Sequence, residues 1–265
     1  MNLLAFDTST DTLCIAVQRG SGALAQERTQ QPVQVWQHSG PGGAQASATL
    51  IPAIRQLMQQ AGLEFADLAA IVFGRGPGSF TGLRTACSVA QGLAFGARAG
   101  GVPVLPVDSL LAVAEEARWQ HTALAQPAVP TPPGGLMVTA MLDARMDEIY
   151  VQTYSFAGHS WTSDGLCRLI RPEALQTSAA LLAGNVFVSY GQRLPESITG
   201  SEPPRWAVLP TATALLRLAP ALLRAGLAVP ADEALPLYIR DKVAQTTQER
   251  LLAQSLRPLP SPAIS

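Results

Sequence analysis

The sequence predicts a two-lobed α/β protein in which each lobe is built on a mixed sheet. Residues 68–107 have the pattern of a strand, a helix and a second strand, which is typical of a parallel βαβ unit. A strand, an aspartate-containing turn and a second strand occur at residues 3–17 and again at 136–156, as a duplicated fold would show. Residues 125–135 are rich in proline and glycine and predict a connecting segment between two halves.

The chain order suggests how the lobes divide. We expect a first lobe over residues 1–107 and a smaller second lobe over residues 108–210. Leucine and alanine cover more than half the circumference of a helix near 211–226, so this helix is expected to return to the first lobe and be buried between the two. The proline-rich residues 257–265 are predicted to be a disordered tail.

Composition limits the class of function. The chain has 265 residues, of which 48% are hydrophobic, and its net charge is −1 with a pI near 6.3. A protein that binds nucleic acid unaided usually carries a basic excess, and here Lys242 is the single lysine. Any contact with RNA is therefore expected to depend on a partner.

The first lobe is predicted to open with strands at residues 3–6, 13–17 and about 23–28. A polar, glycine-rich segment at 31–48 predicts a loop before a helix over 49–61. Pro52 lies in the first turn of this helix or kinks it, and Gly62 ends it. The apolar face of the helix comprises Leu50, Ile54, Leu57, Met58 and Ala61.

The second lobe is less regular. Ser109 is expected to cap a helix that runs to about Gln120. Strands at 136–142 and 148–156 flank a turn at 143–147. A short helix over 172–182 and a strand over 186–190 are predicted to follow.

The glycine-rich stretch at residues 74–84 organises the first lobe. Glycines around Pro77 allow a sharp strand-to-helix turn, and Ser79 or Thr81 is available as N-cap of a helix that runs to Ala97. From Thr85 onward this helix has no charged residue, and it shows two stripes at helical spacing. One is apolar (Leu83, Ala86, Ala90, Leu93, Ala97) and the other is made of small residues (Thr85, Ser88, Gly92, Gly96). We expect one stripe to pack inside the chain and the other to face a partner.

Three motifs carry a family resemblance. Gly74–Arg84 followed by Ala90–Ala94, then Asp143–Tyr150 and Pro236–Arg240, resemble in order the motifs of the TsaB (YeaZ) family. The resemblance implies an actin-like fold (acetate kinase–sugar kinase–Hsp70–actin) and a non-catalytic, cytoplasmic subunit. Members pair with the paralogue TsaD, or with themselves, through two helices. The TsaE ATPase joins them, and the complex transfers threonylcarbamoyl to the adenosine beside the anticodon of tRNA.

The stripes and the resemblance together predict a partner interface. It comprises Leu50, Ile54, Met58, Arg75, Gly78, Phe80, Gly82, Arg84, Thr85, Ser88, Gly92 and Gly96. The resemblance also implies that tRNA is reached only through the complex. No cofactor is expected to bind this chain tightly, although ATP can lie at or near the partner interface.

No metal site is expected. TsaD carries a His-x-x-x-His pair on the helix that corresponds to residues 49–61, and this chain has Ala46 and Leu50 at those places. Three cysteines, Cys14, Cys87 and Cys167, have no metal-like spacing and predict reduced thiols. An acidic residue by position 7 and the lack of a long apolar run predict neither a signal peptide nor a membrane span.

Two alternative functions stay open. A kinase-like phosphotransferase is suggested by the glycine-rich turn, with Arg84 as a cation beside an anion-binding helix N-terminus, and with Asp7, Asp143 and Arg145 as candidate cofactor-binding residues. The turn after Asp7 lacks glycine, however, and equally predicts a polar hairpin closed by side-chain hydrogen bonds. Arg145 is expected to pair with Asp147 across the second hairpin.

The other alternative is a peptidase. It would need a metal or an activated nucleophile, and the candidate bases are His38, His121 and His159. None of them has an obvious orienting carboxylate in the sequence.

Overall fold

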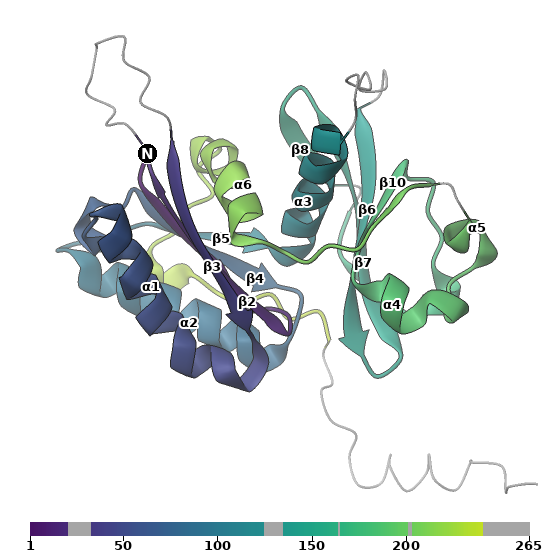
Figure 1. Ribbon diagram of the computed structural model, residues 1–265, viewed down its shortest axis with the longest axis horizontal. Helices are drawn as coiled ribbons and strands as arrows, with labels where there is room; N and C mark the ends of the chain where they lie inside the picture. The colour runs from purple at the N-terminus through teal and green to yellow at the C-terminus, as the bar shows by residue number, and fades with distance from the viewer. Residues whose placement is uncertain (21–32, 125–134, 164, 201–202, 241–265) are drawn as a thin grey trace, which may run out of the picture.

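The computed structural model describes residues 1–20, 33–124, 135–163, 165–200 and 203–240. Two β-sheets stand side by side with helices on their faces (Figure 1). The predicted strand at 23–28 and the predicted tail at 257–265 lie outside the described residues.

The first sheet has the strand order β3-β2-β1-β4-β5. Its strands are β1 (Leu3–Asp7), β2 (Thr12–Arg19), β3 (Gln34–Pro41), β4 (Ala70–Gly76) and β5 (Val104–Asp108). The first three are antiparallel, whereas β4 runs parallel to β1 and to β5. The predicted strand–helix–strand unit is therefore confirmed, with α2 (Phe80–Ala97) as the crossover helix.

Strand β3 corrects the predicted loop at 31–48. It pairs with β2 along its whole length, and most of its side chains are exposed. Because β3 is an edge strand with little packed against it, its sequence shows no alternation of apolar and polar residues. The usual signal for a half-buried strand is absent from it.

Helices cover both faces of the first sheet (Figure 1). On one face lie α1 (Ala46–Ala61) and α2, whose buried sides pack on Phe6, Ile15 and Phe73. On the other face α6 (Ala212–Arg224) packs on β1, β2 and β4, beside α3 (Ser109–Leu124). Helix α1 begins three residues earlier than predicted, and Gly62 ends it in the left-handed conformation with φ 60°.

The second sheet repeats the plan of the first. Its strands are β6 (Leu136–Arg145), β7 (Glu148–Ala157), β8 (Ser160–Ser163), β9 (Arg168–Ile170), β10 (Leu181–Gly184) and β11 (Arg205–Trp206). The order is β11-β10-β6-β7-β8, with β9 also on β7. Here too an antiparallel hairpin is extended on its first strand by two parallel strands. The sequence echo between residues 3–17 and 136–156 thus reflects a repeated topology.

Two predictions in the second lobe were wrong. Residues 172–182 form a short 3-10 helix, η3 (Pro172–Ala174), and the start of strand β10, because the apolar run there is fully buried next to β6. Residues 186–190 form helix α4 (Val186–Tyr190) in place of a strand. Val186 and Tyr190, four residues apart, both face the core, whereas Val188 points to solvent.

The remaining short helices connect these elements. They are η1 (Gly43–Gln45), η2 (Phe65–Asp67), η4 (Gly191–Arg193), α5 (Glu196–Thr199) and η5 (Ala231–Glu233).

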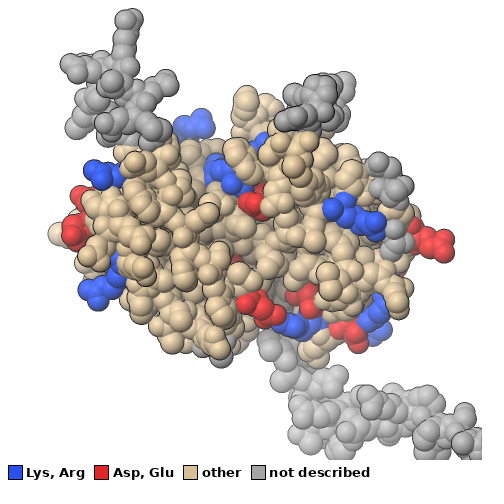
Figure 2. Space-filling model, viewed as in Figure 1, with Lys and Arg blue, Asp and Glu red and all other residues tan. Residues whose placement is uncertain are grey.

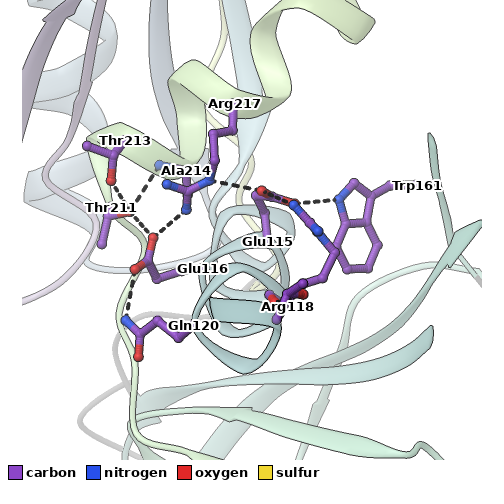
Figure 3. A network of polar contacts seen from close by, with 10 residues as sticks. Glu115, Glu116, Arg118, Gln120, Trp161, Thr211, Thr213, Ala214 and Arg217 are labelled. Atoms are coloured by element: carbon purple, nitrogen blue, oxygen red, sulfur yellow. Dashed lines mark hydrogen bonds and ion pairs between the residues drawn. The ribbon is translucent and has the colours of Figure 1, made fainter. Parts of the chain in front are cut away.

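A buried charge network joins α3 to α6 (Figure 3). Glu115 and Glu116 are only 3% and 8% exposed. Arg217 of α6 contacts both carboxylates, and Glu115 also accepts hydrogen bonds from Arg118 and from the Trp161 indole at 3.1 Å. Each carboxylate thus has charged and neutral donors, which offsets the cost of its burial.

Hydrogen bonding keeps Glu116 ionised. Burial alone would raise its pKa, but hydrogen bonds from Gln120, Thr211 and Arg217 outweigh burial and lower the pKa below its ordinary value. The network fixes α6, which covers the first sheet, against α3, which also packs on the second sheet.

Candidate functional site

The outer sides of α1 and α2 form one exposed surface, which we call the helix face. Its large apolar residues are Ile51, Phe80 and Phe95, with 43%, 37% and 82% of their surface exposed. Phe80 stands at the edge of this face, where it also lines the cleft between the lobes. Figure 2 shows the surface over these helices as largely uncharged, whereas charged side chains alternate along the opening between the lobes. Apolar side chains gathered in this way on one face are typical of an interaction surface.

The two predicted stripes of α2 lie on different sides of the helix, with Thr85, Leu93 and Ala97 half-buried between them. Leu83, Ala86 and Ala90 are buried against the first sheet, together with Cys87 and Ala94. On the opposite side Ser88, Gly92 and Gly96 are exposed. A Cβ atom added at Gly92 or Gly96 would meet nothing within 4 Å, so neither glycine is required by packing within the chain.

Part of the predicted interface lies in the chain's own core. Leu50, Ile54 and Met58 are buried between α1 and the first sheet. Gly82 and Gly78 lie against the β1–β2 turn, where an added Cβ would come within 1.9 Å of the Thr8 carbonyl and 2.4 Å of the Ser9 carbonyl.

Arg75 is also turned away from the helix face, and its Nε lies 2.6 Å from Asp108 Oδ1. The predicted interface residues at the surface are Phe80, Arg84, Thr85 (half-buried), Ser88, Gly92 and Gly96. Ile51 and Phe95 were missed, although each is a large apolar residue outside the buried stripe of its helix.

The chain after α6 returns along α2. We call residues 228–240 the return segment. The Ala234 carbonyl accepts hydrogen bonds from Cys87 Sγ and from Gln91 Nε2 at 3.0 Å, and the Leu237 amide donates to the Arg75 carbonyl at 2.7 Å. The motif at 236–240 is therefore fixed to the start of the crossover unit.

The return segment also positions Arg84. The Arg84 guanidinium stacks 3.8 Å from the centroid of Phe80, and its Nε donates to Tyr238 Oη at 3.1 Å. The rings of Phe80 and Tyr238 are 4.9 Å apart. Arg84 therefore contacts the aromatic side chains of Phe80 and Tyr238 and is otherwise exposed to solvent. The N-terminus of α2 is capped by the Ser79 side chain.

Asp7 is fully buried under the β1–β2 turn. Its Oδ1 accepts hydrogen bonds from the amide and hydroxyl of Ser9 at 2.7 and 2.6 Å, and its Oδ2 accepts from Ser109 Oγ at 2.9 Å. Burial raises the pKa of this carboxyl, although the three hydrogen bonds act in the opposite direction. Ser109 therefore begins α3 with its hydroxyl directed to Asp7, which corrects its predicted role as a helix cap.

Asp143 and Arg145 line a cleft between the lobes with a volume of about 560 Å³. Asp143 accepts hydrogen bonds from the Arg145 amide at 2.7 Å and from Tyr190 Oη at 2.8 Å. Burial and this hydrogen bond to Asp143 raise the pKa of Tyr190 to about 12. Arg145 reaches across the cleft to Asp11, and its Nη2 lies 2.6 Å from Oδ2.

The predicted pair between Arg145 and Asp147 was wrong. Asp147 binds Arg193 at 2.6 Å, and Arg145 binds Asp11 of the other hairpin. Residues 145–147 all have positive φ, between 55° and 62°, which turns neighbouring side chains in different directions.

Within the described residues, no group of three or more His, Cys, Asp and Glu side chains has the arrangement to hold a metal ion. The described helices include none that is both long and apolar enough to span a bilayer.

Comparison with known proteins identifies the family. The sequence profile of TsaD, described as tRNA N6-adenosine threonylcarbamoyltransferase, matches residues 38–185. The tRNA threonylcarbamoyladenosine biosynthesis protein TsaB of Haemophilus influenzae is 30% identical over 259 residues, which cover 92% of this chain and 95% of that protein. The chain belongs to the TsaB (YeaZ) family.

Other proteins of the TsaB (YeaZ) family are similar to this chain over most of its length. The Escherichia coli protein of the same name is 28% identical over 92% of this chain and 96% of its own length. The solved structure of YeaZ from Pseudomonas aeruginosa superposes with a TM-score of 0.71 at 32% identity, over 90% of this chain and 99% of that one. The predicted fold class, an actin-like α/β fold with two mixed sheets, is confirmed.

Proposed function

We propose that this TsaB-family chain is a non-catalytic subunit of the machinery that makes threonylcarbamoyladenosine in tRNA. It pairs through the helix face with a TsaD-family protein, and in isolation it pairs with itself through the same surface. The TsaE ATPase joins the complex, and tRNA is reached only through that complex. The names of the related proteins support the pathway, and the helix face supports the pairing.

The observation that carries the proposal is the pair of exposed glycines in α2. Glycine in the interior of a helix costs about 1 kcal/mol relative to alanine. Gly92 bears this cost, and a Cβ atom added at Gly92, or at Gly96 near the end of α2, would meet nothing within 4 Å in the isolated chain. A partner helix lying across α2 explains both, because helices pack at interaxial distances of 8–10 Å and small residues let them come closest.

The polar residues near the cleft support a non-catalytic role. Both carboxylate oxygens of Asp7 accept hydrogen bonds from Ser9 and Ser109, and the side chain is fully buried away from the cleft. Asp143 and Arg145 are likewise engaged with Tyr190 and Asp11. These contacts hold the two hairpins in place, and this structural role alone explains why polar residues occupy these positions.

The test is the variant Gly92→Arg. A long charged side chain on the helix face should abolish copurification with TsaD while leaving a folded chain, because its Cβ has room and its helix propensity is better than that of glycine. Gly191→Arg is the matched control, since Gly191 in the second lobe also has nothing within 4 Å of an added Cβ. Retained pairing in the first variant, or equal loss in the second, would refute the proposed interface.

The kinase-like alternative would use the cleft between the lobes as its nucleotide site. For the proposed subunit, calorimetric titration of ATP into the isolated chain should show no binding at millimolar nucleotide. Heat that appears only when TsaD is present would place the nucleotide at or near the partner interface. Tight binding to the chain alone, lost in Arg145→Met, would favour a phosphotransferase.

A further inference from the structure

The charged residues of the helix face are all positive. Helices α1 and α2 together contain two charged residues, Arg55 and Arg84, and both are exposed. The chain as a whole has a net charge of −1. The few charges of these two helices are therefore all positive, on a protein whose net charge is slightly negative.

Arg84 differs from Arg55 in how it is held. Within the described part of the chain Arg84 forms no ion pair, yet its guanidinium is fixed by the stack on Phe80 and the bond from Nε to Tyr238. These two contacts leave the terminal nitrogens Nη1 and Nη2 free to donate. For Arg55 no interaction is found among the described residues.

The site lies one helical turn from the N-terminus of α2, where a cation opposes the helix dipole. Two aromatic residues thus hold in one position an arginine that has no carboxylate partner among the described residues. Arginine and aromatic side chains dominate the binding energy of protein interfaces, and a rigid guanidinium fork binds a carboxylate with two parallel hydrogen bonds.

We propose that Arg84, held by Phe80 and Tyr238, is the anchor of the helix face and binds a carboxylate of the partner protein. This inference rests on the proposed function and names the chemistry of the partner surface. A second copy of this chain can pair through the apolar part of the helix face, but its α1 and α2 contain no carboxylate to offer Arg84. The group that binds Arg84 is therefore expected to belong to a different protein with an acidic residue. The motif at 236–240 gains a role, because it supplies the tyrosine that orients the anchor.

The experiment measures the affinity of purified full-length chain for the TsaD protein of the same organism by calorimetry. Arg84→Met should weaken binding at least tenfold, as loss of a central arginine does in other interfaces. Arg84→Lys should also weaken it severalfold, because lysine keeps the charge but loses the fork and the stack. Arg55→Met removes another exposed charge from the same face, one without a fixed geometry, and should stay within about twofold of the unmodified chain.

Circular dichroism and thermal melting verify folding: Arg84→Met loses two surface contacts, to Phe80 and Tyr238, and should still unfold in one cooperative transition. Binding within twofold for Arg84→Met, or equal losses for Arg84→Met and Arg55→Met, would overturn the anchor. So would an Arg84→Lys variant that binds as well as the parent. If Gly92→Arg abolishes pairing while Arg84→Met does not, the proposed function stands and the anchor falls.

A charge swap identifies the bound group. Arg84→Glu should lose binding, and changing the correct TsaD carboxylate to arginine should restore it. If no such reversal restores binding, the carboxylate assignment is refuted. Sedimentation of the chain alone should show self-association unchanged by Arg84→Met; dissociation there, with TsaD binding intact, would mean that the anchor serves a second copy.

Discussion

Arg145 Nη2 lies 2.6 Å from Asp11 Oδ2 and joins the β6–β7 hairpin to the β1–β2 hairpin across the cleft between the lobes. Both side chains are mostly exposed, 67% and 79%, so solvent screens the pair strongly. The backbone of this turn is in an unusual conformation, because three successive non-glycine residues have positive φ. We expect this conformation to affect stability more than the exposed ion pair does. Two features of this turn, its charge and its backbone, can therefore be separated by mutation.

The ion pair should contribute little to stability. Arg145→Met is expected to change the free energy of unfolding by less than about 1 kcal/mol, as is usual for exposed pairs. Urea denaturation at low and high salt measures the effect. A larger loss that salt does not reduce would show that Arg145 does more than this pair suggests.

The backbone of the turn should matter more. At Asp147, φ is 61°, a conformation that glycine adopts freely and alanine does not. Asp147→Gly and Asp147→Ala both remove the contact with Arg193, so their difference isolates the backbone term. Asp147→Gly should be the more stable of the two by about 1 kcal/mol. Equal stabilities would contradict the strain.

The α3–α6 network should be a major source of stability. Arg217→Met leaves two buried carboxylates without their shared cation and should cost about 3–5 kcal/mol. Arg224→Met is the matched control on the same helix, because Arg224 is exposed and its one hydrogen-bond partner among the described residues is the Pro220 carbonyl. Its effect should be below about 0.5 kcal/mol. Comparable losses in the two variants would contradict the importance of the network.

The same network predicts a loss of stability in acid. The native state keeps Glu116 ionised to lower pH than the unfolded chain does, because its pKa is lowered from 4.5. As pH falls below this value the unfolded chain binds the proton first, so the contribution of Glu116 is present at neutral pH and is lost through the lowered pKa. Glu116→Gln should flatten the stability curve in this acid range. Urea midpoints measured between neutral pH and pH 3 test it.

Asp7 should act in the opposite direction. Its pKa is raised from 3.8, so above that value the native state holds a proton that the unfolded chain has released. The contribution of Asp7 to stability therefore falls as the pH rises from 3.8 to the raised pKa of the native state. Asp7→Asn removes that slope and should stay within about 1 kcal/mol at neutral pH, because an amide is isosteric and still accepts from Ser9.

Asp7→Ala serves as the contrast. It leaves the donors of Ser9 and Ser109 without an acceptor and should cost about 3 kcal/mol. An Asp7→Asn chain that remains stable but no longer supports the tRNA modification would reassign Asp7 to chemistry.

The glycines of α2 provide a further comparison. Gly92→Ala should raise the free energy of unfolding by about 1 kcal/mol, since this position is open and inside the helix, and Gly96→Ala should raise it less, since Gly96 is the next-to-last residue of α2. Gly82→Ala should lower it, because its Cβ would collide with the Thr8 carbonyl at 1.9 Å. Thermal melting of the three variants distinguishes a glycine needed for folding from those proposed to serve a partner.

The elements with strong periodicity could be predicted from the sequence. Helix α2, its cap at Ser79 and the parallel strands on either side of it have local signals, and so does the repeated hairpin. Strand β3 and helix α4 could not be predicted in this way. The first is a polar edge strand, and the second consists of β-branched and aromatic residues whose helical form depends on packing Val186 and Tyr190 into the second lobe.

The site was harder to predict than the fold, because its contacts join distant parts of the chain. Arg145 and Asp11 are separated by 134 positions, and Arg84 and Tyr238 by 154. Nothing near Arg145 in the sequence distinguishes Asp147 from Asp11 as its partner. Residue spacing located the stripe on α2 correctly, but it assigned the buried side of α1 to the surface.

Helix α6 follows the second sheet in the chain and yet covers the first, packing on Leu3, Ala5 and Val72. During synthesis, the strands of the first sheet leave the ribosome long before residues 212–219 can cover that apolar face. Domains generally fold as units and N-terminal parts emerge first, so this nascent sheet stays half-covered while the whole second sheet is translated. The order of segments therefore leaves this apolar face of the first sheet to be covered last.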